Sequence, residues 1–232
     1  YITGNGAVGI NKGLIENEGE SGMHAVGGNA TAKNEGTISN TGGAAMRLDT
    51  DGQIINEGII SNKSGLGMFA SKSSGGSVRN KGLISNTGTT GMSLEGKSHS
   101  TGINDTNGII KNTGTQGMYV EGSNSIATNK GTIENGGQHG MYAASGSQII
   151  NETGAIIKNK SSNGMYSTGT NSIATNTGTI SNTGNNGMYS ASSGKAINQG
   201  TISNTGQTGI YVAAGTTSIN DTNGVIKNKD KY

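Results

Sequence analysis

The sequence contains no cysteine, no proline and no tryptophan, and it has a single phenylalanine. The absence of cysteine excludes a disulfide framework and thiol chemistry. No run of 18 apolar residues is present, so no transmembrane helix is predicted. Charged residues make up only 13% of the chain, the formal net charge is +2, and lysine and arginine are scattered. We therefore expect no nucleic-acid partner, because such binding needs a basic stripe or patch.

Glycine is abundant, with 43 copies, while hydrophobic residues make up 29% of the chain. This composition is typical of disorder, but the apolar residues recur at fixed positions. The eight methionines lie 22 to 26 residues apart, at Met23, Met46, Met68, Met92, Met118, Met141, Met165 and Met188. Ten isoleucines keep the same step, at Ile15, Ile38, Ile60, Ile84, Ile110, Ile133, Ile157, Ile180, Ile202 and Ile226. Their nine gaps give (226 − 15)/9, or about 23 residues per unit, which indicates a solenoid.

Three short apolar segments occur in each unit. The first reads Gly-Thr-Ile-Ser-Asn at 36–40, the second Gly-Met-Tyr at 117–119, and the third places Ile or Val shortly before Asn and Gly, as at 196–200. Such segments predict strands rather than helices, because interior glycine disfavours a helix. The predicted fold class is all-β: a right-handed, single-stranded parallel β-helix of about ten rungs of roughly 23 residues, with three short strands per rung. We expect residues 1–232 to form one continuous segment of a longer protein, because the chain starts and ends in mid-repeat.

The alternation of side chains along a strand assigns the faces. The recurring Ile and Met are predicted to point inward, together with the residue two positions after each Met. The slot directly after each Met is predicted to face solvent, because His24 and Arg47 occupy it in early units. For the third segment the register stays open, since Ile and Asn are spaced differently at 126–129 and 149–151.

Two asparagine columns accompany these segments. One follows each recurring Ile by two residues; the other comprises Asn11, Asn34, Asn56, Asn80, Asn129, Asn151, Asn176 and Asn198. Asparagine stabilises turns and can form hydrogen-bonded ladders along a stack, which we favour over a polar ligand-binding face. Corner glycines are expected to adopt positive φ, namely Gly42, Gly88, Gly114, Gly184 and Gly206.

Few residues could carry chemistry. The histidines His24, His99 and His139 lie in different units without a repeated partner, so we expect no metal site. The sequence Asn-Asp-Thr-Asn occurs at 104–107 and 220–223; it is interpreted as a corner one residue longer rather than a cation loop. Asp49 and Asp51 form the only close aspartate pair and are expected at a solvated corner. We expect no catalytic residues, no cofactor and no enzymatic activity.

One exposed column is a candidate binding site. Tyrosine fills the slot after Met in five consecutive units, at Tyr119, Tyr142, Tyr166, Tyr189 and Tyr211. Tyrosines at strand spacing stabilise one another across strands. They also form an amphipathic strip suited to contact with sugar or protein. Both interpretations stay open.

The Met-Tyr step and the Asn-Thr-Gly corner, clearest at 176–189 and 198–211, resemble the passenger regions of large fusobacterial autotransporter adhesins, the RadD-like group. This resemblance covers essentially the whole chain. It implies type V secretion through a carboxy-terminal outer-membrane barrel of the parent chain and display at the bacterial cell surface as an extracellular passenger. It also implies adhesion, through the full-length protein, to glycans or proteins on host cells or other bacteria.

The expected function is therefore a stalk or display segment of a surface adhesin, acting as a monomeric rod. A first alternative makes the tyrosine column itself a glycan- or protein-binding face. A second, less favoured alternative is a glycan-cleaving β-helix, which would need clustered carboxylates that the sequence does not show.

Overall fold

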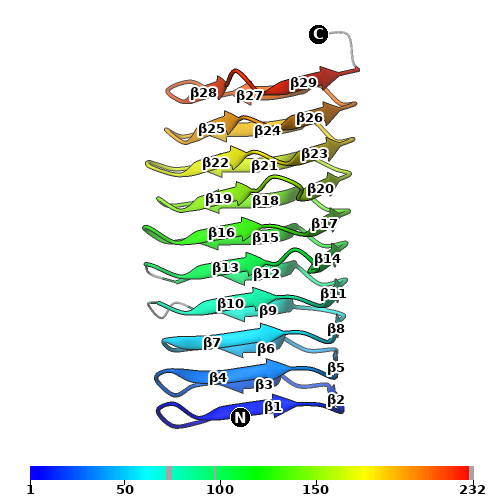
Figure 1. The fold of residues 1–232 in the computed structure, drawn as a ribbon, viewed down its shortest axis with the longest axis vertical. Helices are drawn as coiled ribbons and strands as arrows, with labels where there is room; N and C mark the ends of the chain where they lie inside the picture. Colours follow the sequence, from blue (N-terminus) through cyan, green and yellow to red (C-terminus); the bar gives the residue numbers. More distant parts are fainter. Residues whose placement is uncertain (72–74, 97, 230–232) are drawn as a thin grey trace.

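The computed structural model describes residues 1–71, 75–96 and 98–229, which form 29 strands and no helix. No helix in this part of the chain could cross a membrane. The strands stack in rungs along one long axis, with the two termini at opposite ends (Figure 1). The arrangement is a parallel β-solenoid of about nine turns with three sheets. The all-β, parallel β-helix prediction is thereby confirmed at this level, whereas the right-handed winding stays a prediction.

The Ile sheet carries the recurring isoleucines. Its ten strands are β2 (Leu14–Asn17), β5 (Thr37–Asn40), β8 (Ile59–Asn62), β11 (Leu83–Asn86), β14 (Ile109–Asn112), β17 (Thr132–Asn135), β20 (Ile156–Asn159), β23 (Thr179–Asn182), β26 (Thr201–Asn204) and β29 (Val225–Asn228).

The Met sheet carries the methionines. Its nine strands are β3 (Ser21–Ala25), β6 (Ala44–Leu48), β9 (Leu66–Ala70), β12 (Thr90–Leu94), β15 (Gln116–Glu121), β18 (His139–Ala144), β21 (Asn163–Thr168), β24 (Asn186–Ala191) and β27 (Thr208–Val212).

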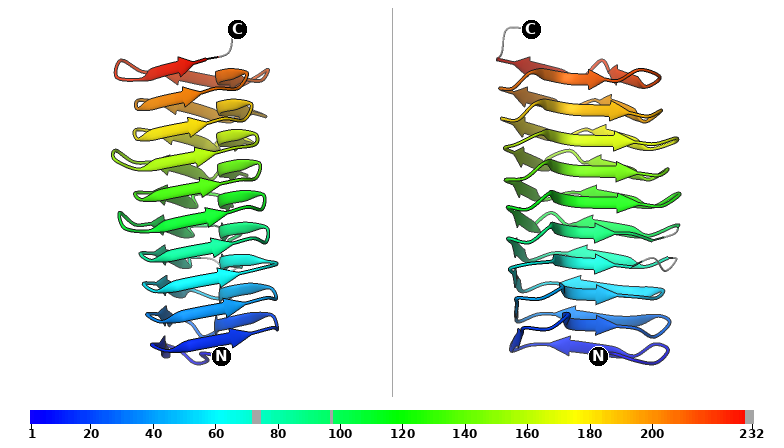
Figure 2. Two further views of the ribbon diagram at one scale, coloured as in Figure 1. Left: turned by 90° about the vertical axis from the view of Figure 1, so that its right-hand side faces the viewer. Right: turned by 180° about the vertical axis from the view of Figure 1, so that it is seen from behind.

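The third sheet completes each rung. Its ten strands are β1 (Val8–Asn11), β4 (Ala30–Asn34), β7 (Gly52–Asn56), β10 (Ser77–Asn80), β13 (Thr101–Asn104), β16 (Ile126–Asn129), β19 (Gln148–Asn151), β22 (Ile173–Asn176), β25 (Lys195–Asn198) and β28 (Thr217–Asn220). Figure 2 shows the three sheets from two further sides.

Every strand pairs in parallel with its counterpart in the next rung, and like residues lie beside like. Met118 pairs with Met141, and Ile133 pairs with Ile157. The methionines and the central isoleucines are buried, as predicted. The exceptions are Ile226 and Val212, 38% and 39% exposed, and Ile15, which is half-buried, because all three lie in the end rungs and have a neighbour on one side only.

The register left open for the third sheet is fixed by its asparagines. They pair with one another in every rung, so the inward apolar residue is the one two positions before each Asn, as at Ile54, Val78 and Ile149. The strands at 126–129 and 149–151 differ because Ala127 takes the inward position in one and Ile149 in the other.

Both asparagine columns are hydrogen-bonded ladders inside the rod. In each rung the Nδ2 of one Asn donates to the Oδ1 of the next, at 2.8 Å from Asn56 to Asn80 and 2.9 Å from Asn112 to Asn135. Most members are almost fully buried, so the ladders satisfy polar groups that would otherwise be unpaired. The ladder interpretation is confirmed. The second ladder also contains Asn104 and Asn220, which its sequence column omitted.

The predicted positive φ at Gly42, Gly88, Gly114, Gly184 and Gly206 is wrong. Positive φ occurs at other glycines, including Gly122 and Gly146 at the corner that follows the Met sheet. A Cβ at Gly114 would instead overlap the carbonyl oxygen of Gly88 in the preceding rung. These glycines are required because the corners of successive rungs stack too closely for a side chain.

Corner length between the third sheet and the Ile sheet varies. Asn80 Nδ2 donates to the carbonyl of Gly82, two residues on, whereas Asn104 donates to Gly108, four residues on. The Asn-Asp-Thr-Asn corner is therefore two residues longer than the ordinary corner, not one. In this corner Asp105 forms an ion pair with Arg79 of the preceding rung, so the Asp105 side chain links the two rungs.

Candidate functional site

The tyrosine strip consists of Tyr119, Tyr142, Tyr166, Tyr189 and Tyr211, one from each of β15, β18, β21, β24 and β27. Backbone pairing places each tyrosine directly beside the next. The first four are half-buried, and Tyr211 is 47% exposed. The outward assignment of this slot fails only at Ser93, which is buried because its short side chain lies between Phe69 and Tyr119.

The rings of the strip pack mainly on one another. Tyr142 and Tyr166 stack with centroids 4.9 Å apart and planes at 9°, and Tyr166 and Tyr189 stack at 4.8 Å and 5°. At either end the rings tilt, to 46° between Tyr119 and Tyr142 and to 64° between Tyr189 and Tyr211. Since the central ring faces are turned toward neighbouring rings, solvent meets mainly ring edges and hydroxyl groups. The expected stacking is confirmed, and ligand binding stays a prediction.

His139 belongs to this strip, which the sequence interpretation missed. Its ring lies 5.4 Å from Tyr142 and 5.0 Å from Tyr166. A 3.2 Å hydrogen bond joins its Nδ1 to Asn163, which in turn accepts one from Asn186. Burial lowers the pKa of His139 to about 4, so the ring is neutral near pH 7.

Two glutamates flank the amino-terminal end of the strip. Glu121 Oε2 accepts a 2.7 Å hydrogen bond from the Tyr119 hydroxyl, and Glu95 Oε1 accepts one of 3.2 Å from Ser93. Burial, followed by the Glu121 contact, raises the pKa of Tyr119 well above its usual value. Because Leu94 pairs with Val120, the two glutamates that follow them lie in adjacent rungs. Each carboxylate is already engaged by a hydroxyl group.

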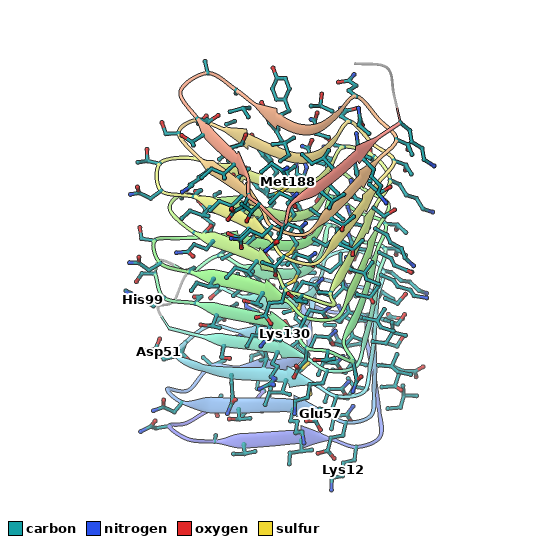
Figure 3. The ribbon with its side chains drawn as sticks, turned by 45° about the horizontal axis from the view of Figure 1, so that its top comes forward. Lys12, Asp51, Glu57, His99, Lys130 and Met188 are labelled. Atoms are coloured by element: carbon teal, nitrogen blue, oxygen red, sulfur yellow. The ribbon has the colours of Figure 1, made fainter. Side chains whose placement is uncertain are left out.

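Of the remaining predicted polar residues that the structure describes, only His24 and Asp49 lie in contact. Asp49 accepts hydrogen bonds from His24 Nε2 at 2.6 Å and Arg47 Nε at 2.8 Å. Burial raises the pKa of Asp49, but these hydrogen bonds outweigh it and leave the pKa below its usual value. Asp49 is thus part of an ion-paired cluster rather than a solvated corner, whereas Asp51 and His99 lie on outer loops (Figure 3). Among the described residues, no three metal-binding side chains come together.

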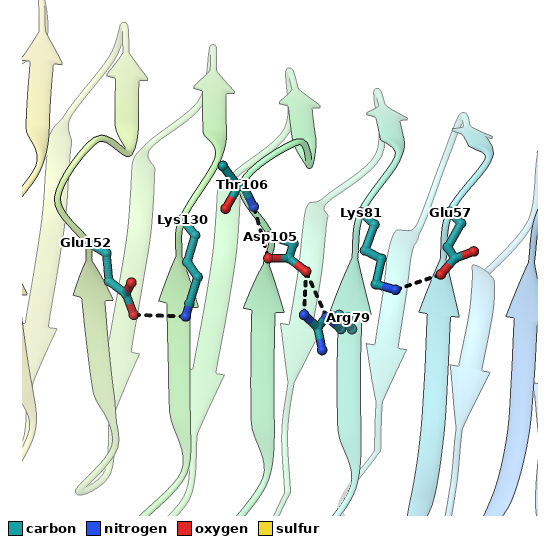
Figure 4. A network of polar contacts seen from close by, with 7 residues as sticks. All are labelled: Glu57, Arg79, Lys81, Asp105, Thr106, Lys130 and Glu152. Atoms are coloured by element: carbon teal, nitrogen blue, oxygen red, sulfur yellow. Dashed lines mark hydrogen bonds and ion pairs between the residues drawn. The ribbon is translucent and has the colours of Figure 1, made fainter.

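An ion-pair series follows the corner between the third sheet and the Ile sheet. Glu57 forms an ion pair with Lys33 at 2.8 Å. Glu57 also forms one with Lys81 at 2.7 Å, and Lys130 forms one with Glu152 at 3.5 Å (Figure 4). These residues link successive rungs on the outside of the rod. Exposed pairs of this kind contribute little individually, on the order of 0.2–1 kcal/mol.

Comparison with known proteins identifies a family. Residues 86–224 match the family model of the BigA third pectate lyase-like domain. No curated protein and no solved structure matches the chain.

Proposed function

The chain belongs to the BigA third pectate lyase-like domain family, a bacterial surface-protein family, and from this premise we propose that it is a stalk segment of a cell-surface adhesin. In this proposal the segment is a right-handed, monomeric rod that carries no catalytic activity. It is part of an autotransporter passenger that is exported through an outer-membrane barrel in its parent chain. The rod holds the binding elements of that protein away from the membrane, toward glycans or proteins of another cell.

The observation that carries this proposal is the unbroken internal register. Both asparagine ladders run from the first rung to the last, and each of their hydrogen bonds ties one rung to the next. Met and Ile columns fill the space between them. A repeat stack in which every unit is bonded to its neighbours in the same way resists bending and local opening, as a stalk requires.

A second candidate is a binding face formed by the tyrosine strip. It is favoured by the distribution of the tyrosines: five consecutive rungs carry them, while earlier rungs fold with His24, Arg47, Phe69 and Ser93 at the same slot. The fold therefore does not require tyrosine at this position. A row of hydroxyl groups at rung spacing would offer hydrogen bonds to a sugar or a protein backbone.

The two candidates are separated by replacing all five tyrosines of the strip with serine in the full-length protein, displayed on cells. A stalk predicts adhesion equal to that of the parent protein at matched surface levels. A binding strip predicts loss of adhesion while the purified segment keeps its β-structure. The stalk proposal is overturned if the folded variant no longer adheres.

A further inference from the structure

A second surface feature lies on the outer face of the Ile sheet, where it turns toward the Met sheet. Here a groove of about 350 Å³ is lined by three lysines and one glutamate: Lys111, Lys158, Lys160 and Glu134. The rest of the lining comes from Asn112, Thr113, Asn135 and Gly136. We call these four charged residues the lysine groove.

The charges of the lysine groove are stacked by the rung register. Lys111 pairs with Glu134, and Glu134 pairs with Lys158. The carboxylate therefore lies between a lysine of the preceding rung and a lysine of the following rung. The ion pair to Lys158 is 2.9 Å long and that to Lys111 is 3.9 Å. Hydrogen bonding from Lys158 holds the pKa of Glu134 below its usual value, and Lys111 and Lys160 act in the same direction.

One carboxylate cannot neutralise three ammonium groups. The groove therefore carries two uncompensated positive charges, as many as the net charge of the whole chain. The charge is also local, because the neighbouring rungs place Ser85 and Ser181 at the same outward slot. The side chains of Lys111 and Lys158 are each 56% exposed, so both remain accessible to a ligand.

We propose that the lysine groove binds the sulfate esters of an anionic polysaccharide. The donor set suits an oxyanion that is bound by point charges: lysine carries a compact charge and binds such oxyanions, and the groove is lined by no arginine among the described residues. Lys111 and Lys158 lie two rungs apart, about 10 Å along the axis, and this spacing suits an extended polymer that runs along the rod. The inference does not depend on the stalk function.

The test measures binding of the purified 232-residue chain to heparin, to desulfated heparin and to an unsulfated, carboxylated polysaccharide. Heparin is expected to bind and the two unsulfated polymers to bind at least tenfold more weakly. Each exposed charge contact is worth up to about fivefold in affinity, so Lys158→Gln with Lys160→Gln should weaken heparin binding by roughly tenfold. Higher salt should weaken binding by the parent chain more than by this variant.

Two further variants make the assignment specific. Glu134→Gln removes the one negative charge, so it should strengthen heparin binding by about two- to fivefold. Lys130→Gln removes one positive charge at a different corner, beside Glu152, and should leave binding unchanged. The proposal is wrong if Glu134→Gln weakens binding, or if Lys130→Gln lowers it as much as the double variant. Equal binding of the carboxylated polymer or of a DNA oligonucleotide would also overturn the assignment to sulfate.

Discussion

The amino-terminal and carboxy-terminal rungs of the Met sheet share an inner face and differ on the outer one. From Met46 to Met188 every methionine has zero exposure, whatever residue follows it. Outside, Arg47 lies 5.7 Å from the Phe69 ring and pairs with Asp49, whereas the later rungs carry the tyrosine strip. The inner columns therefore fix the fold, and the outer slots vary without disturbing it. Function should be sought on the outer face.

The sharpest contrast between the faces uses two adjacent isoleucines of β8. Ile60 is fully buried, while Ile59 is 46% exposed. Ile60→Asp buries an unpaired carboxylate and should lower the free energy of unfolding by at least about 4 kcal/mol. Ile59→Asp makes the same change on the outside and should cost less than about 1 kcal/mol. Chemical denaturation of both variants checks this; equal losses would contradict the assignment of faces.

A smaller effect is expected from the asparagine ladder. Asn104 donates to Asn129 Oδ1 at 2.8 Å and accepts from Asn80, whereas Asn107 is exposed in the same corner. Asn104→Ala leaves ladder groups unpaired in the interior and should cost about 3 kcal/mol. Asn107→Ala should be nearly neutral. If thermal and chemical melts shift equally for the two, the ladder does not stabilise the rod.

On the outer face, His139 should make the stability of the rod depend on pH. Its folded pKa, about 4, lies below the ordinary 6.5, so folding favours the neutral ring. The contribution of the neutral His139 ring to the free energy of unfolding is fully present above about pH 6.5. It falls by roughly 2–3 kcal/mol as the pH drops to 4. His139→Asn, which installs the residue found at positions 163 and 186 of the same column, should remove this decline. Unfolding curves at pH 7, 5.5 and 4 test it; parallel declines would refute the role of His139.

The smallest effect is expected in the tyrosine strip. Tyr166 stacks on Tyr142 and Tyr189, and each cross-strand aromatic pair contributes roughly 0.2–1 kcal/mol. Tyr166→Ser should therefore lower stability by about 1 kcal/mol, and Tyr166→Phe should retain most of it. Differential scanning calorimetry resolves the pair of variants. A loss as large as that in Ile60→Asp would show that the strip belongs to the core.

The repeat columns predicted the fold because each inward position must be apolar or ladder-forming in every rung. Met118 and Ile133 could be assigned from spacing alone. Corner glycines could not, since the overlap at Gly114 is with the preceding rung and depends on the stacking distance. Asn104 was left out of the asparagine column because the corner after it has two extra residues.

The site was predicted only in part. The tyrosine strip is visible as a column in the sequence, but His139 is not. Gly140 and Met141 are both buried, which breaks the alternation and places His139 on the same outer face as Tyr142. The lysine groove was also missed, because Lys111 and Lys158 are 47 residues apart in sequence (158 − 111) and meet only through the rung register.

The central claim is that the chain is a rod of interchangeable rungs held by its inner columns. Deleting residues 113–159 joins Asn112 to Lys160, removes two rungs and preserves the corner length and both ladders. Small-angle X-ray scattering of this variant should show a folded rod of unchanged cross-section, shortened by about 10 Å, or two strand spacings. An unfolded or aggregated chain, or a rod of undiminished length, would contradict the account.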